Sequence, residues 1–244
     1  MKVLALYDIH GNIDALDAVL GDPRAADPDR IVVGGDAVPG PFAGSTLARL
    51  DDLPSAVSWI RGNGEREVAE AVDGPPAAPD DLTRHTAAIT AAEIGDARAR
   101  ALGALPLTLE LDDVLYCHAS PRRDDEMLTR MSSAERWADA LVGVDAPLVV
   151  GGHTHQQDDR MVGGTRFVNA GSVGLPYEGD AAAYWLWVVD GDPHLRRTAY
   201  DAAGAGGRIL AGGWPDERSV SAALIEPMEP RVITEIFEGL ADGT

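Results

Sequence analysis

The sequence predicts a layered α/β domain that contains a mixed sheet. Short runs rich in Val, Ile and Leu recur along the chain, and each stops abruptly at polar residues or glycine. Helical patterns separate the early runs, whereas the later runs are joined by short connections. Apolar runs of about four to six residues bounded by Gly and Asp are typical of strands. Alternation with helices favours parallel pairing and short connections favour antiparallel pairing, so both are expected.

The first helix is expected directly after the first strand. Ile13, Leu16, Val19 and Leu20 share one helical face, and Gly21 stands where a helix would end. The expected strands cover, in chain order, residues 3–6, 31–33, 56–60, 114–117, 148–150 and 166–168.

Two further helical regions are predicted, and one glycine-rich segment is not. Residues 80–102 are alanine-rich and should form two helices broken near Gly95, and Pro230 opens an apolar stripe typical of a helix. Residues 202–213 carry five glycines and predict a turn or mobile loop. No repeat or linker divides the chain, so a single domain over residues 1–244 is expected.

Composition excludes several functions. The chain has 20 basic and 40 acidic residues and a net charge of −20, which argues against a nucleic-acid groove or an anionic membrane surface. Its one lysine, Lys2, excludes chemistry that needs an interior lysine, and its one cysteine, Cys117, excludes a disulfide or a thiolate zinc cluster. The longest apolar run, residues 181–189, is about half of a membrane span, so a soluble, cytoplasmic protein is expected.

Histidines collect where predicted strands end. His10, His118, His153 and His155 occupy such positions, and Asp8 precedes His10 by two residues. Ligands bind at the carboxyl ends of strands in α/β sheets, because loops converge there. In an extended segment residues i and i+2 point the same way, so each closely spaced pair is expected to reach toward one point.

Asp36 and Asn63 follow two further predicted strands beside glycines. Each cluster alone is more easily a structural or solvent-facing feature, but their shared position favours one metal site. A mixture of imidazole, carboxylate and amide oxygen suits divalent Mn, Fe, Co, Ni or Zn.

These motifs together resemble the calcineurin-like metallophosphoesterase superfamily. They are, in order, Asp8-Ile9-His10-Gly11-Asn12, Gly35-Asp36, Gly62-Asn63, His118 and Gly152-His153-Thr154-His155. The segment from Asn169 to Gly174 follows as in small prokaryotic members, and the opening is similar to a bacterial branch of small phosphodiesterases or diadenosine tetraphosphatases.

The resemblance implies a four-layer α/β/β/α sandwich of two mixed sheets and a centre of two divalent metal ions, manganese being the first choice. It implies that Asp8, His10 and His155 hold one ion, that Asn63, His118 and His153 hold the other, and that Asp36 bridges both. Asp36, Asn63 and His118 are the implied catalytic residues.

The implied reaction is hydrolysis of a small-molecule phosphodiester by in-line attack of a metal-bridging hydroxide. A nucleoside polyphosphate hydrolase, a protein phosphatase and a metal-holding binder without turnover remain open. The expected partner is a small anionic phosphate ester, and a homo-oligomer is possible.

One position departs from the family pattern. Many members carry a histidine after the residue equivalent to Asn63, thought to protonate the leaving oxygen, and here it is Gly64. Glu65 or His85 could supply the proton, but a water or a substrate with a good leaving group is favoured. On that hypothesis, Gly64→His should raise activity most on poor leaving groups.

Two other assignments stay open. Arg61 and Arg122 could hold substrate phosphates, with ion pairs to nearby carboxylates as the alternative reading of Arg122. Ser172 sits in a near match to a serine-hydrolase elbow, but a turn follows it where that motif needs a helix.

Overall fold

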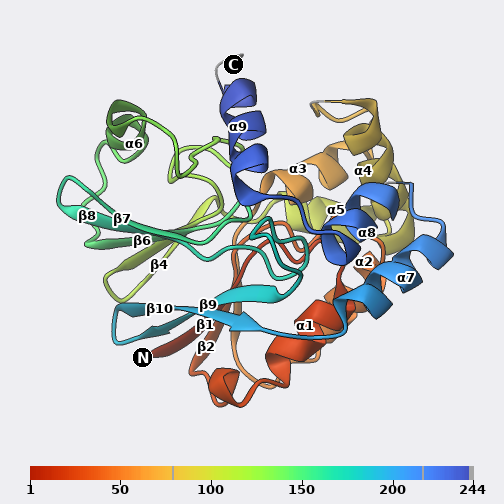
Figure 1. Ribbon diagram of the computed structural model, residues 1–244, viewed down its shortest axis with the longest axis horizontal. Coiled ribbons are helices and arrows are strands. Elements are labelled where there is room, and N and C mark those ends of the chain that lie inside the picture. Colours follow the sequence, from red (N-terminus) through yellow and green to blue (C-terminus); the bar gives the residue numbers. More distant parts are fainter. Residues whose placement is uncertain (79, 216, 242–244) are drawn as a thin grey trace.

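A computed structural model describes residues 1–78, 80–215 and 217–241 as two five-stranded mixed sheets flanked by helices (Figure 1). The strands of the first sheet lie in the order β10 (Asp192–Thr198), β9 (Ala183–Val189), β1 (Lys2–Leu6), β2 (Arg30–Val33) and β3 (Val57–Trp59). Those of the second lie in the order β4 (Thr108–Leu111), β5 (Val114–Cys117), β6 (Leu148–Gly151), β8 (Thr165–Asn169) and β7 (Asp158–Val162).

Both sheets are parallel at the centre and antiparallel at their margins. β1, β2 and β3 pair in parallel, as do β5, β6 and β8, while β9, β10, β4 and β7 pair antiparallel. The expectation of a mixed sheet is confirmed. The helices are α1 (Ile13–Leu20), α2 (Ala43–Asp51), α3 (Asn63–Glu70), α4 (Asp81–Ile94), α5 (Asp96–Gly103), α6 (Ala134–Ala140), α7 (Ala202–Gly212), α8 (Glu217–Ile225) and α9 (Pro230–Ala241).

The two sheets pack face to face through a buried apolar layer. Val3 and Ala5 of the first sheet lie in one cluster with Tyr116 and Val150 of the second. The Tyr7 hydroxyl crosses this layer and donates to the Val150 carbonyl at 3.1 Å. Because side chains alternate along a strand, the neighbouring residues face outward onto helices.

The outward faces complete the four layers. Leu4 and Leu6 of β1 pack with Leu16 of α1 and with residues of α2 to α5. On the far side, Phe167 of β8 packs against Trp137 of α6, with ring centroids 4.8 Å apart. The α/β/β/α sandwich implied by the resemblance is therefore confirmed. In the part of the chain that the structure describes, no helix is long and apolar enough to cross a membrane.

The helices expected from apolar periodicity are present. α1 ends before Gly21 as predicted, and the alanine-rich region divides at Gly95 into α4 and α5. Pro230 opens α9, although much of its expected apolar stripe stays exposed, including Val232 and Ile236.

The expectation of a loop over residues 202–213 is wrong, because these residues form α7. Asp201 caps the helix by accepting from the Gly204 N–H at 3.0 Å. At Gly206 a Cβ would lie 2.8 Å from Ile225 of α8, so the glycine permits close helix packing. Tertiary packing therefore outweighs the low helix propensity of glycine.

Candidate metal centre

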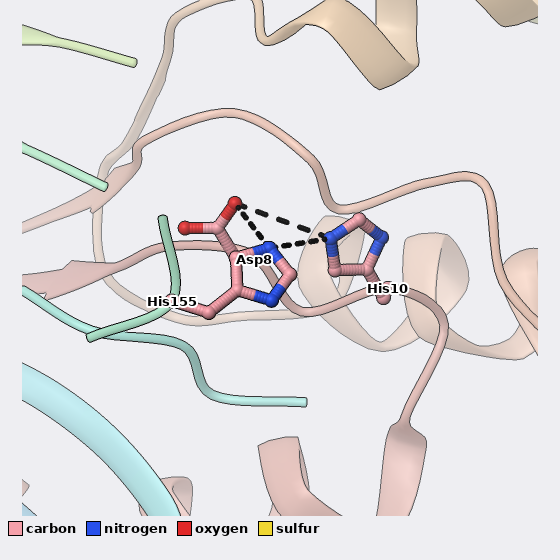
Figure 2. A group of neighbouring side chains, drawn as sticks. All are labelled: Asp8, His10 and His155. Carbon is pink, nitrogen blue, oxygen red and sulfur yellow. Dashed lines mark hydrogen bonds and ion pairs between the residues drawn. The ribbon is translucent and has the colours of Figure 1, made fainter. Parts of the chain in front are cut away.

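The loops that follow β1, β2, β5 and β6 bring the predicted ligands together. Two groups form, in each of which the candidate ligand atoms lie within 4.8 Å of one another. The first consists of Asp8, His10 and His155 (Figure 2). His155 Nε2 lies 3.2 Å from Asp8 Oδ1 and 3.1 Å from His10 Nε2.

The second group consists of Asp36, His118 and His153. His118 Nε2 lies 3.5 Å from Asp36 Oδ2 and 3.7 Å from Asp8 Oδ1. Asp36 Oδ2 also lies 3.7 Å from His10 Nε2. The Asp36 carboxylate therefore faces both groups, as a bridging ligand must.

Four buried polar atoms at this centre lack a hydrogen-bond partner. They are Asp8 Oδ1, Asn63 Oδ1, His118 Nε2 and His153 Nε2. An unpartnered polar atom in the interior costs about 1–3 kcal/mol, so a cluster of them indicates a missing partner. All four atoms are ligand types that a divalent transition metal accepts, and the residues therefore fit the metal centre that the fold implies.

Backbone carbonyls orient three of the imidazole rings. In each ring Nδ1 is within hydrogen-bond distance of a carbonyl oxygen, which leaves Nε2 directed at the centre. The Nδ1–oxygen distances are 3.3 Å for His10 and Pro39, 2.9 Å for His118 and Gly34, and 2.6 Å for His155 and Leu175.

The ligand loops adopt an unusual backbone conformation. Asp8, His10, Asp36, His153 and His155 have φ between 47° and 69°, in the left-handed region. Asp8 and His10 do meet in one group, but His153 and His155 join different groups, and neither pair lies in the extended segment that was expected. Each such residue stores about 1–3 kcal/mol of strain, which the surrounding structure must offset. Hydrogen bonds between the loops do so, among them His10 N–H to the Asp36 carbonyl at 2.9 Å.

The charges of the cluster are tightly coupled. Although burial alone would raise the pKa of Asp36, His118 and His10 hold it well below its usual range. Burial opposes protonation of His118, yet the carboxylates of Asp36 and Asp8 raise its pKa to about 10. Burial and the charge of His118 lower the pKa of His153 to about 4. The carboxylates of Asp36 and Asp8, which favour the protonated form of His118, would also attract a divalent cation.

Glu65 is fully buried beneath the Asp36 loop and has a structural role that sequence analysis missed. Its carboxylate accepts from the N–H groups of Asp36, Ala37 and Gly62, each at 2.8 Å. With its oxygens occupied by backbone donors, Glu65 is not placed to protonate a leaving group. His85 is exposed on α4.

Gly64 is required by close packing. A Cβ at this position would lie 2.2 Å from the Val38 carbonyl and 2.9 Å from Asp36 Oδ1. The Val38–Gly40 segment thus fills the space where a side chain at residue 64 would begin. Gly64→His cannot be accommodated without moving this backbone, so it does not serve as a test of the missing general acid.

We expect Gly64→Ala to lower the melting temperature by about 3 °C or more, because overpacking against backbone costs about 1–3 kcal/mol. Gly207→Ala is the matched control, since Gly207 is exposed in α7 with no atom within 4 Å of an added Cβ. It should leave the melting temperature unchanged or raise it slightly. Equal melting temperatures for the two variants in a thermal scan would contradict the packing argument.

Two cavities flank the centre and share Asn63 and Glu67 in their walls. The threonine cavity, about 160 Å³, is further defined by Thr83, Thr86, Trp214 and Val220. The arginine cavity, about 410 Å³, is further defined by Arg66, Arg123, Arg136, Met127 and Leu240. Burial and the nearby Asp36 raise the pKa of Glu67, between the two, to about 8.

The arginines singled out from the sequence lie elsewhere. Arg61 donates to Asp124 at 3.2 Å, and Arg122 pairs with Glu126 and Asp139. Neither lines the threonine or the arginine cavity. Arg66 and Glu67, which sequence analysis missed, follow Asn63 by three and four residues, a helical spacing that places them on the same face.

Ser172 is not arranged as a nucleophile. It is fully buried, its hydroxyl donates to the Asp8 carbonyl at 2.7 Å, and the same oxygen accepts from the Leu175 N–H at 2.8 Å. Its contacts support the first ligand loop instead.

Comparisons with known proteins bear on this centre. A model of the calcineurin-like phosphoesterase superfamily domain matches residues 1–192. A metallophosphoesterase from Sphaerobacter thermophilus has a similar structure, with 23% identity, a TM-score of 0.73, and coverage of 93% of this chain and 100% of that one. A hypothetical protein from Pyrococcus horikoshii OT3 gives 21% identity, a TM-score of 0.75, and coverage of 93% and 99%. No match was found among curated proteins.

Proposed function

The chain belongs to the calcineurin-like phosphoesterase superfamily, and on that premise we propose that it hydrolyses small-molecule phosphodiesters with two divalent metal ions. The observation that carries the proposal is that four buried atoms suited to metal binding lack a hydrogen-bond partner at the two groups of side chains. Manganese is the proposed first choice on the resemblance to the family, and the mixed oxygen and imidazole donors also suit Fe, Co, Ni or Zn.

The proposed ligand sets assign Asp8, His10 and His155 to one ion, and Asn63, His118 and His153 to the other, with Asp36 between them. When bound, two such ions activate water and neutralise charge that develops on phosphoryl oxygens.

The chain's own groups fix this geometry. Gly64 N–H donates to Asp36 Oδ1 at 2.8 Å and leaves Oδ2 facing His10 and His118. Asn63 Nδ2 donates to Glu67 Oε1 at 3.4 Å, which engages the amide nitrogen and leaves the buried Oδ1, which lacks a hydrogen-bond partner, as the candidate ligand atom. We therefore assign Glu67 to positioning the Asn63 amide.

A diester is favoured over a monoester by the two cavities. A phosphodiester carries two organic arms, and two cavities that both have Asn63 in their walls adjoin the centre. The terminal phosphate of a monoester carries a second negative charge, and among the described residues that line the threonine cavity no arginine or lysine is present to pair with it, whereas Asp36 and Glu67 contribute carboxyl groups. With no side chain at Gly64 to protonate the leaving oxygen, substrates with good leaving groups should react best.

We expect bis(p-nitrophenyl) phosphate turnover to disappear when metal is stripped and to return at least ~100-fold above the stripped rate when Mn²⁺ is added. The kcat/KM for bis(p-nitrophenyl) phosphate should exceed the kcat/KM for the monoester p-nitrophenyl phosphate by ~10-fold or more. Metal binding is measured alongside by elemental analysis. If the protein binds metal but hydrolyses no ester, the proposal is wrong and the protein is a non-catalytic metal binder. Failure to bind metal would also overturn the proposal.

A further inference from the structure

The threonine cavity has features that identify what it accepts. We infer that it is the binding site for an uncharged aromatic group carried on one arm of the substrate, so that the substrate is an asymmetric diester. The inference rests on the proposed function, because the aromatic arm is placed there by a phosphoryl group held at the metal centre.

The size of the cavity matches a single ring. It measures about 160 Å³, and a cavity of about 150 Å³ is known to accommodate benzene. His10 and Asp36 of the candidate ligand groups line it together with Trp214 and Val220. The cavity therefore adjoins the centre, and a ring on a phosphoryl oxygen held there could enter it.

The wall is apolar where a ring would lie. Pro39, Leu175, Trp214 and Val220 contribute to it, and the Thr86 hydroxyl is already engaged as a donor to the Thr83 carbonyl at 3.0 Å. Flat apolar groups gain most from burial against such side chains, and an indole is a good partner for an aromatic ring.

The described wall favours an uncharged occupant. Among the described residues that line the cavity, the ionisable side chains are His10, Asp36 and Glu67, and the first two belong to the candidate ligand groups. A charged group placed deeper in the cavity would meet Glu67 and no cationic side chain of the described wall, whereas an uncharged ring needs no ion pair there.

The arginine cavity differs in both size and charge. It is larger, at about 410 Å³, and Arg66, Arg123 and Arg136 line it together with acidic side chains such as Asp125. Its mixed charges suit a larger, polar arm. The two arms of the substrate are thus unequal, and the arm with the ring occupies the threonine cavity, which is lined by residues of α4.

Two residues that line the threonine cavity are not part of the matched family domain. Trp214 and Val220 lie beyond residue 192, where the family match ends. Trp214 is 8% exposed and packs with Ala205 and Ile209 of α7, which holds the indole in place. Part of the wall that would contact the ring is therefore supplied by residues beyond the matched domain.

The test compares phenylphosphonate with methylphosphonate in calorimetric titrations of the manganese-loaded protein. Both ligands present the same phosphonyl oxygens, and only one carries a ring. We expect phenylphosphonate to bind at least ~10-fold more tightly. Thr83→Phe, which fills the cavity from the first turn of α4, should remove this advantage, and Thr83→Leu should remove part of it. Thr83 is half-buried, and its backbone N–H donates to Asp80 in the helix cap, a contact that both substitutions keep, so both variants should fold.

The controls separate the possible failures. His85→Phe adds the same ring to an exposed position two residues away and should leave both affinities unchanged. Methylphosphonate should bind all variants equally, which shows an intact centre. If phenylphosphonate has no advantage, or keeps it in Thr83→Phe, the cavity assignment is wrong while the metal centre stands. If neither phosphonate binds, the proposed function fails and takes this inference with it.

Discussion

Asp36→Asn should lower kcat for bis(p-nitrophenyl) phosphate by ~1000-fold or more in the manganese-loaded protein, a loss of about 4 kcal/mol in transition-state stabilisation. Asp36 is the carboxylate that faces His10 of one ligand group and His118 of the other. Asparagine keeps an oxygen able to accept from the Gly64 N–H but removes the negative charge between the groups. The second ion should therefore bind weakly or be misplaced.

The backbone at residue 36 makes this substitution informative. Its φ of 52° is in the left-handed region, which asparagine tolerates as well as aspartate does. Asp112→Asn is the matched control, because Asp112 has a φ of 53°, is exposed and lies outside the candidate ligand groups. Metal content and turnover are measured for both variants. Retention of more than ~10% of the wild-type kcat by Asp36→Asn would show that Asp36 does not bridge.

Glu65→Ala should lower the melting temperature by at least ~6 °C. Three N–H groups that Glu65 satisfies would lose their acceptor in a buried loop, and each costs about 1–3 kcal/mol. For a chain of this length 1 kcal/mol corresponds to about 2–4 °C. Metal binding should weaken as well, because the Asp36 N–H and the Gly62 N–H are anchored by the same carboxylate.

The comparison variant for Glu65 is Glu93→Ala. Glu93 is exposed and accepts one backbone N–H, from Gly44 at 2.9 Å, so its loss should shift the melting temperature by less than ~3 °C. Calorimetric scans of the metal-free proteins measure both shifts without a contribution from bound ions. Similar shifts for the two variants would show that the buried carboxylate adds no more stability than a surface contact.

The sequence predicts those helices and strands whose residue pattern lies within the element itself or directly beside it. α1 and the division at Gly95 follow from apolar spacing and a stop residue, and the central strands follow from short apolar runs. α7 was missed because Gly206 looks like a helix breaker until its packing against α8 is known. Such long-range contacts carry no signal in the local sequence.

At the centre, the residue types were predictable and their supports were not. The histidines and aspartates stand at strand ends, and the structure brings them together there. The reason offered for their convergence was wrong, since the ligand loops are left-handed rather than extended. The role of Glu65 depends on the N–H groups of a loop far away in sequence, and the positions of Arg61 and Arg122 depend on which acidic partners the fold supplies.

The left-handed ligand loops have a consequence for how the centre can change over evolution. Glycine enters this region freely, asparagine, aspartate and histidine do so more often than other residues, and a β-branched residue does so at high cost. Each of the five positions therefore accepts a small set of residues for reasons of backbone conformation alone, before any ion is considered. Drift at these positions is restricted to residues that can themselves be ligands, apart from glycine. The ability to hold metal should thus persist in relatives that have lost their original substrate.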